Sequence, residues 1–246
     1  MVHLGPLPGS PHYNGDLSTL IAAAVDDAAT LSKAGFDAAL VENFGDAPFF
    51  ADDAPKITAT AMTRAVDAVG RVWLPVGVNV LRNDALAALA IAATTGASFI
   101  RVNVLSGTMF TDQGPIVGSA AEVARFREAH CPDVAVMADV FVKHATPPAG
   151  LTLEGATRDL SERSGADAII VSGSGTGAET ALEDLTSVAD TTHLPVYVGS
   201  GVTADSVAKL LTIADGAIVG TATKPGGNAA APVDLDLAAA MVAAAG

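Results

Sequence analysis

Apolar segments and amphipathic segments alternate eight times along this chain, and this alternation restricts the possible folds more than any other feature. The apolar segments are continuous runs rich in Val, Ile and Leu, which is typical of parallel strands covered on both faces. Each is followed by a segment with helical periodicity, and several of these begin with a Ser, Thr or Asp cap. The predicted strands are residues 2–7, 36–44, 74–81, 99–105, 134–144, 166–173, 194–201 and 215–224.

Such a succession of strand–helix units in 246 residues predicts an α/β protein, a single (β/α)8 TIM barrel that covers residues 1–246 as one domain. A doubly wound open sheet is the main alternative. The even spacing of the units disfavours it, as does the absence of a GxGxxG sequence after the first predicted strand. No linker or low-complexity segment divides the chain.

The composition argues against several kinds of partner. The formal net charge is −14, which disfavours nucleic acid or an anionic membrane surface. No apolar run reaches the roughly 18 residues that a membrane-spanning helix needs. The first ten residues do not resemble a signal peptide, and the lone Cys131 suits a reducing compartment. We therefore expect a cytoplasmic protein without membrane insertion. Its acidic, lysine-poor composition favours a halophilic source over a merely GC-rich genome.

Polar side chains appear where several of the predicted strands end. In a barrel these carboxyl ends carry the active site, and alternate residues of a strand share one face. The opposite phase would bury Asp139 against the helices without a partner, at a cost of several kcal/mol. We therefore predict the phase that directs inward Glu42, Asn79, Asn103, Asp139 and Lys143.

This polar rim predicts acid–base chemistry on a small molecule. Glu42, Asp139 and Lys143 are the candidate catalytic residues. Lys143 suits a Schiff base, a general acid or a phosphate contact, although it could equally neutralise Asp139 as a structural pair. The candidate substrate-binding residues are His3, Asn79, Asn103 and His144. No spacing of His, Asp and Glu resembles a zinc site, so no metal and no organic cofactor is predicted, although the acids could hold Mg²⁺.

Three of the later strands end in glycine-rich segments, at residues 171–177, 198–206 and 219–227. Barrels often hold a phosphate between the loops after strands seven and eight, where backbone N–H groups attract the anion. The glycines could instead only make tight turns, but their place at these two strands favours a phosphate site. Its predicted residues are Gly173, Gly199, Ser200, Gly201, Gly220 and Thr221, with Lys224 as a further candidate.

Several blocks of the sequence together resemble the BtpA family. They are HLGPLPGSP, VENFGDAPF, NVLRNDA, TDQGPIVG, ADVFVKHA and VGSGVTADS. The resemblance spans essentially the whole chain and implies a phosphate-binding (β/α)8 barrel. By their positions in these blocks it adds Asp46 to the catalytic candidates, and Asn43, Arg82 and Asp112 to the substrate-binding candidates. The family's name refers to photosystem I biogenesis, and some members look connected with sugar or nucleoside metabolism.

Three functions remain open. The preferred one is a nucleoside phosphorylase, a pentosyltransferase that uses inorganic phosphate as co-substrate, with Asp139 or Asp46 as the acid for the departing base. The second is a sugar-phosphate isomerase or lyase, in which Glu42 or Asp139 moves a proton and Lys143 stabilises the enolate. The third is a non-catalytic biogenesis factor for a membrane complex. The expected partner is a small molecule, either a nucleoside or a phosphorylated sugar, and a homo-oligomer is expected because barrels commonly pair.

Overall fold

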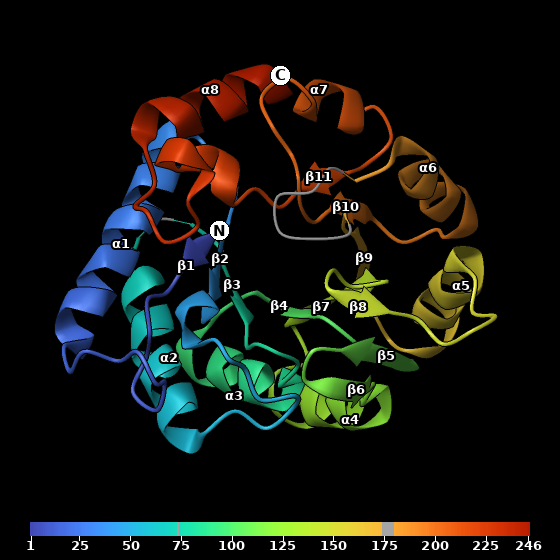
Figure 1. Ribbon diagram of the computed structural model, residues 1–246, viewed down its shortest axis with the longest axis horizontal. Coiled ribbons are helices and arrows are strands. Elements are labelled where there is room, and N and C mark those ends of the chain that lie inside the picture. Colours follow the sequence, from blue (N-terminus) through green and yellow to red (C-terminus); the bar gives the residue numbers. More distant parts are fainter. Residues whose placement is uncertain (73, 174–179) are drawn as a thin grey trace.

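The computed structural model describes residues 1–72, 74–173 and 180–246. Within these ranges, eight parallel strands form one curled sheet whose order follows the chain, as a (β/α)8 barrel requires (Figure 1). The predicted fold class is therefore confirmed. The strands are Val2–His3 (β1), Ala39–Glu42 (β2), Val76–Asn79 (β3), Phe99–Val102 (β4), Ala135–Val140 (β7), Ala168–Val171 (β9), Val196–Val198 (β10) and Gly216–Ala217 (β11).

The helices form a ring around the sheet (Figure 1). They are Leu17–Ala34 (α1), Lys56–Val69 (α2), Ala85–Thr95 (α3), Ala120–His130 (α4), Leu153–Arg163 (α5), Leu182–Thr191 (α6), Val207–Leu210 (α7) and Leu235–Ala245 (α8), with 3₁₀ turns at Phe44–Asp46 (η1), Thr221–Thr223 (η2) and Pro225–Gly227 (η3). Helix α1 illustrates why the helices begin and end where they do. Asp16 caps its first turn, and Gly35 ends it with a left-handed φ of 98°. None of the helices in the described ranges is long and apolar enough to cross a membrane.

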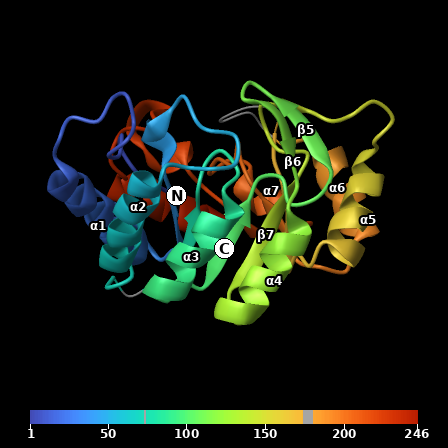
Figure 2. The same cartoon turned by 90° about the horizontal axis from the view of Figure 1, so that it is seen from below.

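The loops after β4 and β7 carry a second, antiparallel sheet that the sequence did not predict. Its strands are Thr108–Thr111 (β5), Gly114–Val117 (β6) and Ala145–Thr146 (β8), in the order β6-β5-β8. Figure 2 shows the β5–β6 hairpin standing above α4 and α5 at one end of the molecule. Strand β7 also ends earlier than predicted, because Phe141 takes a left-handed φ of 50° that turns the chain. Likewise β11 is much shorter than the predicted 215–224, since η2 begins at Thr221.

The register of the sheet arranges polar residues in one layer inside the barrel. His3 of β1 lies opposite Glu42 of β2, and Glu42 lies opposite Asn79 of β3. Their chain neighbours Val41 and Val78 belong to the core between sheet and helices, and both are fully buried. In β1, β2 and β3 alternation therefore gives an apolar side for the helices and polar residues at the inner ends of the strands, as predicted, whereas a second apolar cluster around Met137 and Ile170 fills the layer below.

Candidate functional site

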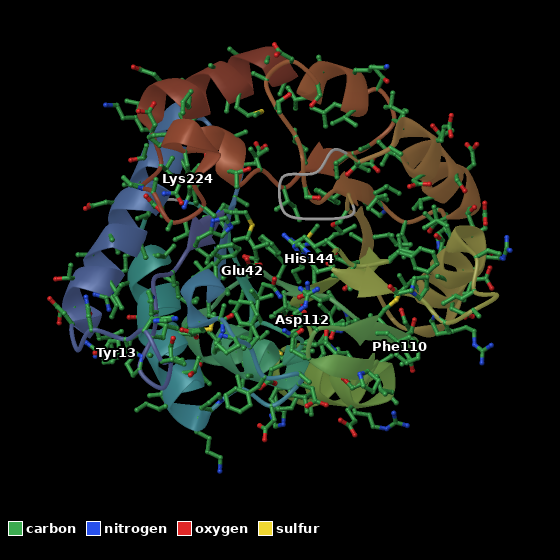
Figure 3. All side chains as sticks on the ribbon, in the orientation of Figure 1. Tyr13, Glu42, Phe110, Asp112, His144 and Lys224 are labelled. Carbon is green, nitrogen blue, oxygen red and sulfur yellow. The ribbon has the colours of Figure 1, made fainter. Side chains whose placement is uncertain are left out.

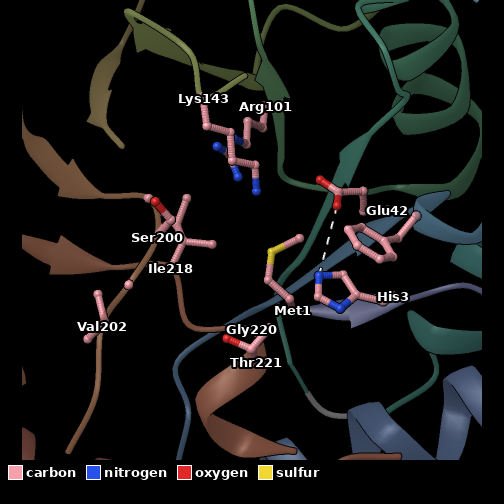
Figure 4. Close-up of a pocket in the computed structure, with 13 residues that line it drawn as sticks. Met1, His3, Glu42, Arg101, Lys143, Ser200, Val202, Ile218, Gly220 and Thr221 are labelled. Atoms are coloured by element: carbon pink, nitrogen blue, oxygen red, sulfur yellow. Dashed lines mark ion pairs between the residues drawn. The ribbon is translucent and has the colours of Figure 1, made fainter. Parts of the chain in front are cut away.

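A small pocket lies among the carboxyl ends of β1, β2, β4, β10 and β11 (Figure 4). It brings together the predicted residues His3, Glu42 and Lys143 with most of the predicted phosphate-binding residues. Its lining is Met1, His3, Glu42, Phe44, Arg101, Lys143, Gly199, Ser200, Gly201, Val202, Ile218, Gly220 and Thr221. The pocket is therefore the place where the two halves of the predicted site meet.

A buried ion pair forms the floor of this region. The Arg101 guanidinium donates two hydrogen bonds of 2.8 Å to the two carboxylate oxygens of Asp139, and Ser172 donates a third of 2.8 Å. Burial opposes the charge of Arg101, but Asp139 and Glu42 together hold its pKa above the usual value. The Asp139 carboxylate is occupied by these donors, and its side chain has no exposed surface. Its role is therefore to hold the Arg101 side chain in position. The ion-pair partner of Asp139 is thus Arg101 and not Lys143.

Lys143 enters the pocket from a corner of unusual backbone. Phe141 and His144 on either side of it have left-handed φ angles of 50° and 58°, which non-glycine residues rarely adopt outside functional segments. Burial lowers the pKa of Lys143, an effect that Glu42 opposes and Arg101 reinforces. Among the residues that line the pocket, two cationic side chains, Arg101 and Lys143, accompany the carboxylate of Glu42. This excess of positive charge favours an anionic ligand.

The loops after β10 and β11 form a glycine cradle on the opposite wall. A Cβ atom at Gly199 would lie 2.4 Å from Ser172 Oγ, so this position has no room for a side chain, and one at Gly220 would make a tight contact of 3.2 Å with His3 Cε1. Within the described residues, the backbone N–H groups of Gly201, Gly220 and Thr221 have no acceptor. Such unbonded N–H groups are suited to phosphate oxygens.

The loop after β9 meets this cradle at Ser200, whose carbonyl also accepts a hydrogen bond of 3.2 Å from the Thr180 hydroxyl. The backbone N–H of Gly173 donates to Ser200 Oγ at 2.9 Å, which joins two of the predicted phosphate-binding residues. The rest of the predicted segment, residues 174–177, lies outside the described residues. Lys224 does not line the pocket, because its ammonium donates to the Ala229 carbonyl at 2.8 Å and lies 3.8 Å from Asp27.

The predicted Asn79 and Asn103 lie inside the barrel but bind each other. Asn79 Nδ2 donates to Asn103 Oδ1 at 2.9 Å and to the Arg101 carbonyl at 3.1 Å. This leaves Asn79 Oδ1 and Asn103 Nδ2 buried and without a partner in the described part of the chain. A free acceptor and a free donor remain, so both residues stay candidates for binding a polar group.

Asn43 and Asp46 lie outside the pocket, in a neighbouring cavity of about 210 Å³. Asn43 Oδ1 accepts the Leu81 N–H at 2.7 Å, and its Nδ2 donates to Asp46 at 3.1 Å. The other Asp46 oxygen accepts the Leu7 N–H at 2.7 Å. Burial raises the pKa of Asp46 despite these two donors. These contacts tie together the loops that follow β1, β2 and β3.

The block NVLRNDA also connects loops around the site. Arg82 donates to the Lys143 carbonyl, so it supports the corner that carries the ammonium. Asn83 binds both the N–H and the carbonyl of Val104, at 2.7 and 2.9 Å. Asp84 caps α3 through the Ala87 N–H and also accepts the Ala54 N–H.

Figure 3 shows the predicted substrate-binding residues His144 and Asp112 over the middle of the molecule, and both are exposed.

The prediction from sequence missed three residues that shape the site. Arg101 and Phe44 line the pocket, and Ser172 holds the Asp139 carboxylate. Arg101 could have been found, because the predicted inward phase of β4 places its cation within the barrel, where a buried charge needs a carboxylate partner. Ser172 and Phe44 follow their strands without a pattern that marks them.

Comparisons with known proteins give the following findings. Residues 1–246 match the model of the BtpA family. The photosystem I biogenesis protein BtpA of Synechocystis sp. is 47% identical over 238 residues, which cover 95% of this chain and 82% of that protein. Among solved structures, thiamine phosphate pyrophosphorylase from Pyrococcus furiosus has a TM-score of 0.61 at 15% identity, covering 90% of this chain and 88% of that one. A 3-hexulose-6-phosphate synthase has a TM-score of 0.60 at 17% identity, and the match covers 92% of this chain and 95% of that one. The structural likeness extends to the fold alone.

Proposed function

This chain belongs to the BtpA family, and from its pocket we propose that it is a pentosyltransferase that converts a nucleoside and inorganic phosphate into a free base and ribose 1-phosphate. The observation that carries the proposal is the cradle of backbone N–H groups at Gly201, Gly220 and Thr221, which find no acceptor among the described residues and share one pocket with Lys143 and Glu42. Backbone donors beside a cation are suited to a phosphate. Both structural neighbours are named after phosphorylated compounds. This agrees with a phosphate in the pocket but assigns no substrate.

The reaction needs a phosphate on one side of the sugar and a departing base on the other. A phosphate oxygen forms a bond to the anomeric carbon while the bond from that carbon to the base breaks. The bonding electrons leave with the base, which takes up a proton, and the proton that hydrogen phosphate loses on forming the ester balances it. Because the sugar gains positive character in the transition state, a phosphate held in place lowers the barrier by proximity and charge. In this proposal Lys143 and Arg101 neutralise the phosphate, and the Glu42 carboxylate faces the sugar.

A second candidate is an isomerase or lyase acting on a sugar phosphate. The lowered pKa of Lys143 favours it, because a larger fraction of neutral amine is available for a Schiff base with a carbonyl substrate. Glu42 lines the same pocket and would move the proton. The third function, a non-catalytic biogenesis role, is supported here only by the name of the Synechocystis relative, and we do not propose it.

The proposal is tested by a turnover assay in high salt with a panel of nucleosides, with and without inorganic phosphate. We expect release of free base only when phosphate is present. Lys143→Met should lower kcat/KM by about 10²-fold or more, as removal of an electrostatic contact to the transition state commonly does. Lys209→Met changes an exposed lysine of α7 and serves as the matched control.

Base release that does not depend on phosphate, or no release from any nucleoside, would overturn the proposal. The same panel is then repeated with pentose phosphates in the presence of borohydride. A stable adduct on Lys143, absent in Lys143→Met, would establish the second candidate instead.

A further inference from the structure

The ring of His3 is held in one tautomer by a carbonyl group. Its Nδ1 lies 3.2 Å from the carbonyl oxygen of Ala229, and the ring packs on Phe44 with centroids 4.7 Å apart. A carbonyl oxygen only accepts hydrogen bonds, so Nδ1 must carry the hydrogen. In a neutral ring, Nε2 is then an acceptor.

The surroundings of His3 keep this ring neutral. Its side chain is only 8% exposed, and the buried Lys224 ammonium donates to the same Ala229 carbonyl at 2.8 Å. Burial first, and the charge of Lys224 second, lower the pKa of His3 to about 3. At neutral pH the ring therefore offers one acceptor, at Nε2, and no second donor.

This acceptor faces a second acceptor across the pocket wall. Nε2 lies 3.9 Å from Oε1 of Glu42, which is too long for a hydrogen bond (Figure 4). Within the described residues no donor binds the Glu42 carboxylate, although its side chain is only 4% exposed. Both side chains line the pocket, and two acceptors that lie side by side there, with no donor among the described residues, leave hydrogen bonds for a ligand to complete.

The charges nearby decide which kind of donor fits. Arg101 and Lys143 line the same pocket, so a metal ion or an ammonium group beside Glu42 would meet their repulsion. A pair of hydroxyl groups is neutral and can donate one hydrogen to each acceptor. Hydroxyls on neighbouring carbons of one sugar ring are spaced closely enough to reach both acceptors at about 2.7 Å.

We propose that His3 Nε2 and the Glu42 carboxylate form a subsite for the cis-diol of a ribosyl group, so that the pocket selects ribosyl over 2-deoxyribosyl substrates. The inference rests on the proposed function for the identity of the sugar. The phosphate cradle adjoins this subsite, because a Cβ atom at Gly220 would lie 3.2 Å from the His3 ring. A diol bound here would therefore lie next to a phosphate in the cradle, as attack at the adjacent anomeric carbon requires.

The test compares a ribonucleoside with the 2′-deoxyribonucleoside of the same base, each with phosphate. We expect the wild-type kcat/KM to be at least about 10-fold higher for the ribonucleoside, since a buried acceptor left without its donor is costly. His3→Phe should remove most of this preference by lowering turnover of the ribonucleoside, while the deoxyribonucleoside changes by less than about threefold. His193→Phe alters an exposed histidine and should change neither value.

Equal kcat/KM values for the two sugars in the wild type would overturn the diol subsite while the proposed function stands. If His3→Phe does not fold, His3→Leu is used, and since His3 is taken as the acceptor of the 2′-hydroxyl, the preference should fall in the same way. If neither nucleoside is turned over, the proposed function fails. Calorimetric binding of ribose 5-phosphate and 2-deoxyribose 5-phosphate then decides the subsite separately. Binding of the ribose compound at least about 10-fold more tightly supports it, whereas equal affinities, or no binding of either, overturn it.

Discussion

At the scale of single residues, the environment of a charge decides its role more than its chemical type does. Asp139 and Glu42 are both carboxylates at strand ends inside one barrel. Asp139 is surrounded by donors from Arg101 and Ser172, whereas no described residue donates a hydrogen bond to the Glu42 carboxylate, which lies 3.9 Å from His3. Asp139 is therefore expected to contribute to stability, and Glu42 to ligand binding.

Asp139→Asn should lower the free energy of unfolding by about 3–5 kcal/mol, because it leaves the buried Arg101 cation without its counter-charge. The measurement is urea unfolding at pH 7. Asp67→Asn is the matched control, since it breaks an exposed pair with Arg71 that is worth about 0.5 kcal/mol. Similar losses in the two variants would contradict the structural role of Asp139.

His3 should make stability depend on pH below neutrality. The folded protein keeps the ring neutral down to about pH 3, whereas the unfolded chain protonates it near pH 6.5. Between these values the unfolded state binds the extra proton, so the free energy of unfolding rises with pH across this window.

His3→Gln should remove that contribution, which is measured as the difference between wild type and variant in unfolding experiments from pH 4 to 8. Above about pH 7 the difference should be constant, and on acidification the wild type should lose more stability. Other carboxylates titrate in both proteins and cancel in the difference. A difference that stays constant throughout would show that the ring has the same pKa in the folded and the unfolded protein.

At the scale of elements, the loops after β1, β2, β3, β4 and β7 are joined mainly by side chain to backbone contacts. Asn43 connects to Leu81, Asn83 to Val104, and Arg82 to Lys143. The conspicuous polar blocks of the sequence thus hold the rim of the barrel in shape. Most polar side chains of these blocks bind neighbouring loops, whereas Glu42 and Lys143 of the same blocks line the pocket.

Asp84→Ala should cost about 2 kcal/mol of stability, more than a helix cap alone, because Asp84 binds both the Ala87 and the Ala54 N–H groups. Asp16→Ala in α1 is the matched control. It is also an N-cap but is exposed and binds only within its own first turn, so a smaller loss is expected. Thermal unfolding of both variants measures the difference, and equal losses would mean that the bond to Ala54 contributes nothing.

At the scale of the whole molecule, the net charge of −14 should make stability depend on salt. Raising KCl from about 0.1 to about 2 M shortens the Debye length from roughly 10 Å to a few Å and screens the repulsion among the acidic side chains. We expect Tm at pH 7 to rise by several degrees. Near the sequence pI of about 4.5, where this repulsion is small, the same increase in KCl should have little effect. Equal shifts at both pH values would assign the effect to general salting-out.

The sequence by itself determined the fold, because the alternation of strands and helices is a local property that each segment carries alone. Period-two alternation also predicted correctly that Glu42, Asn79 and Asp139 face the interior of the barrel, since a single strand decides which side a residue takes. The glycine-rich ends of the last strands likewise indicated where the cradle lies.

Only the tertiary structure decided which of these side chains meet. Asp139 and Arg101 are 38 positions apart, and the stagger between β4 and β7 brings them together. The paths of the loops, which no periodic pattern encodes, turn Asp46 away from the pocket and place Lys224 beneath it. Contacts between distant segments depend on strand register and loop conformation, so the division of the polar residues between ligand pocket and loop support emerges only after the chain has folded.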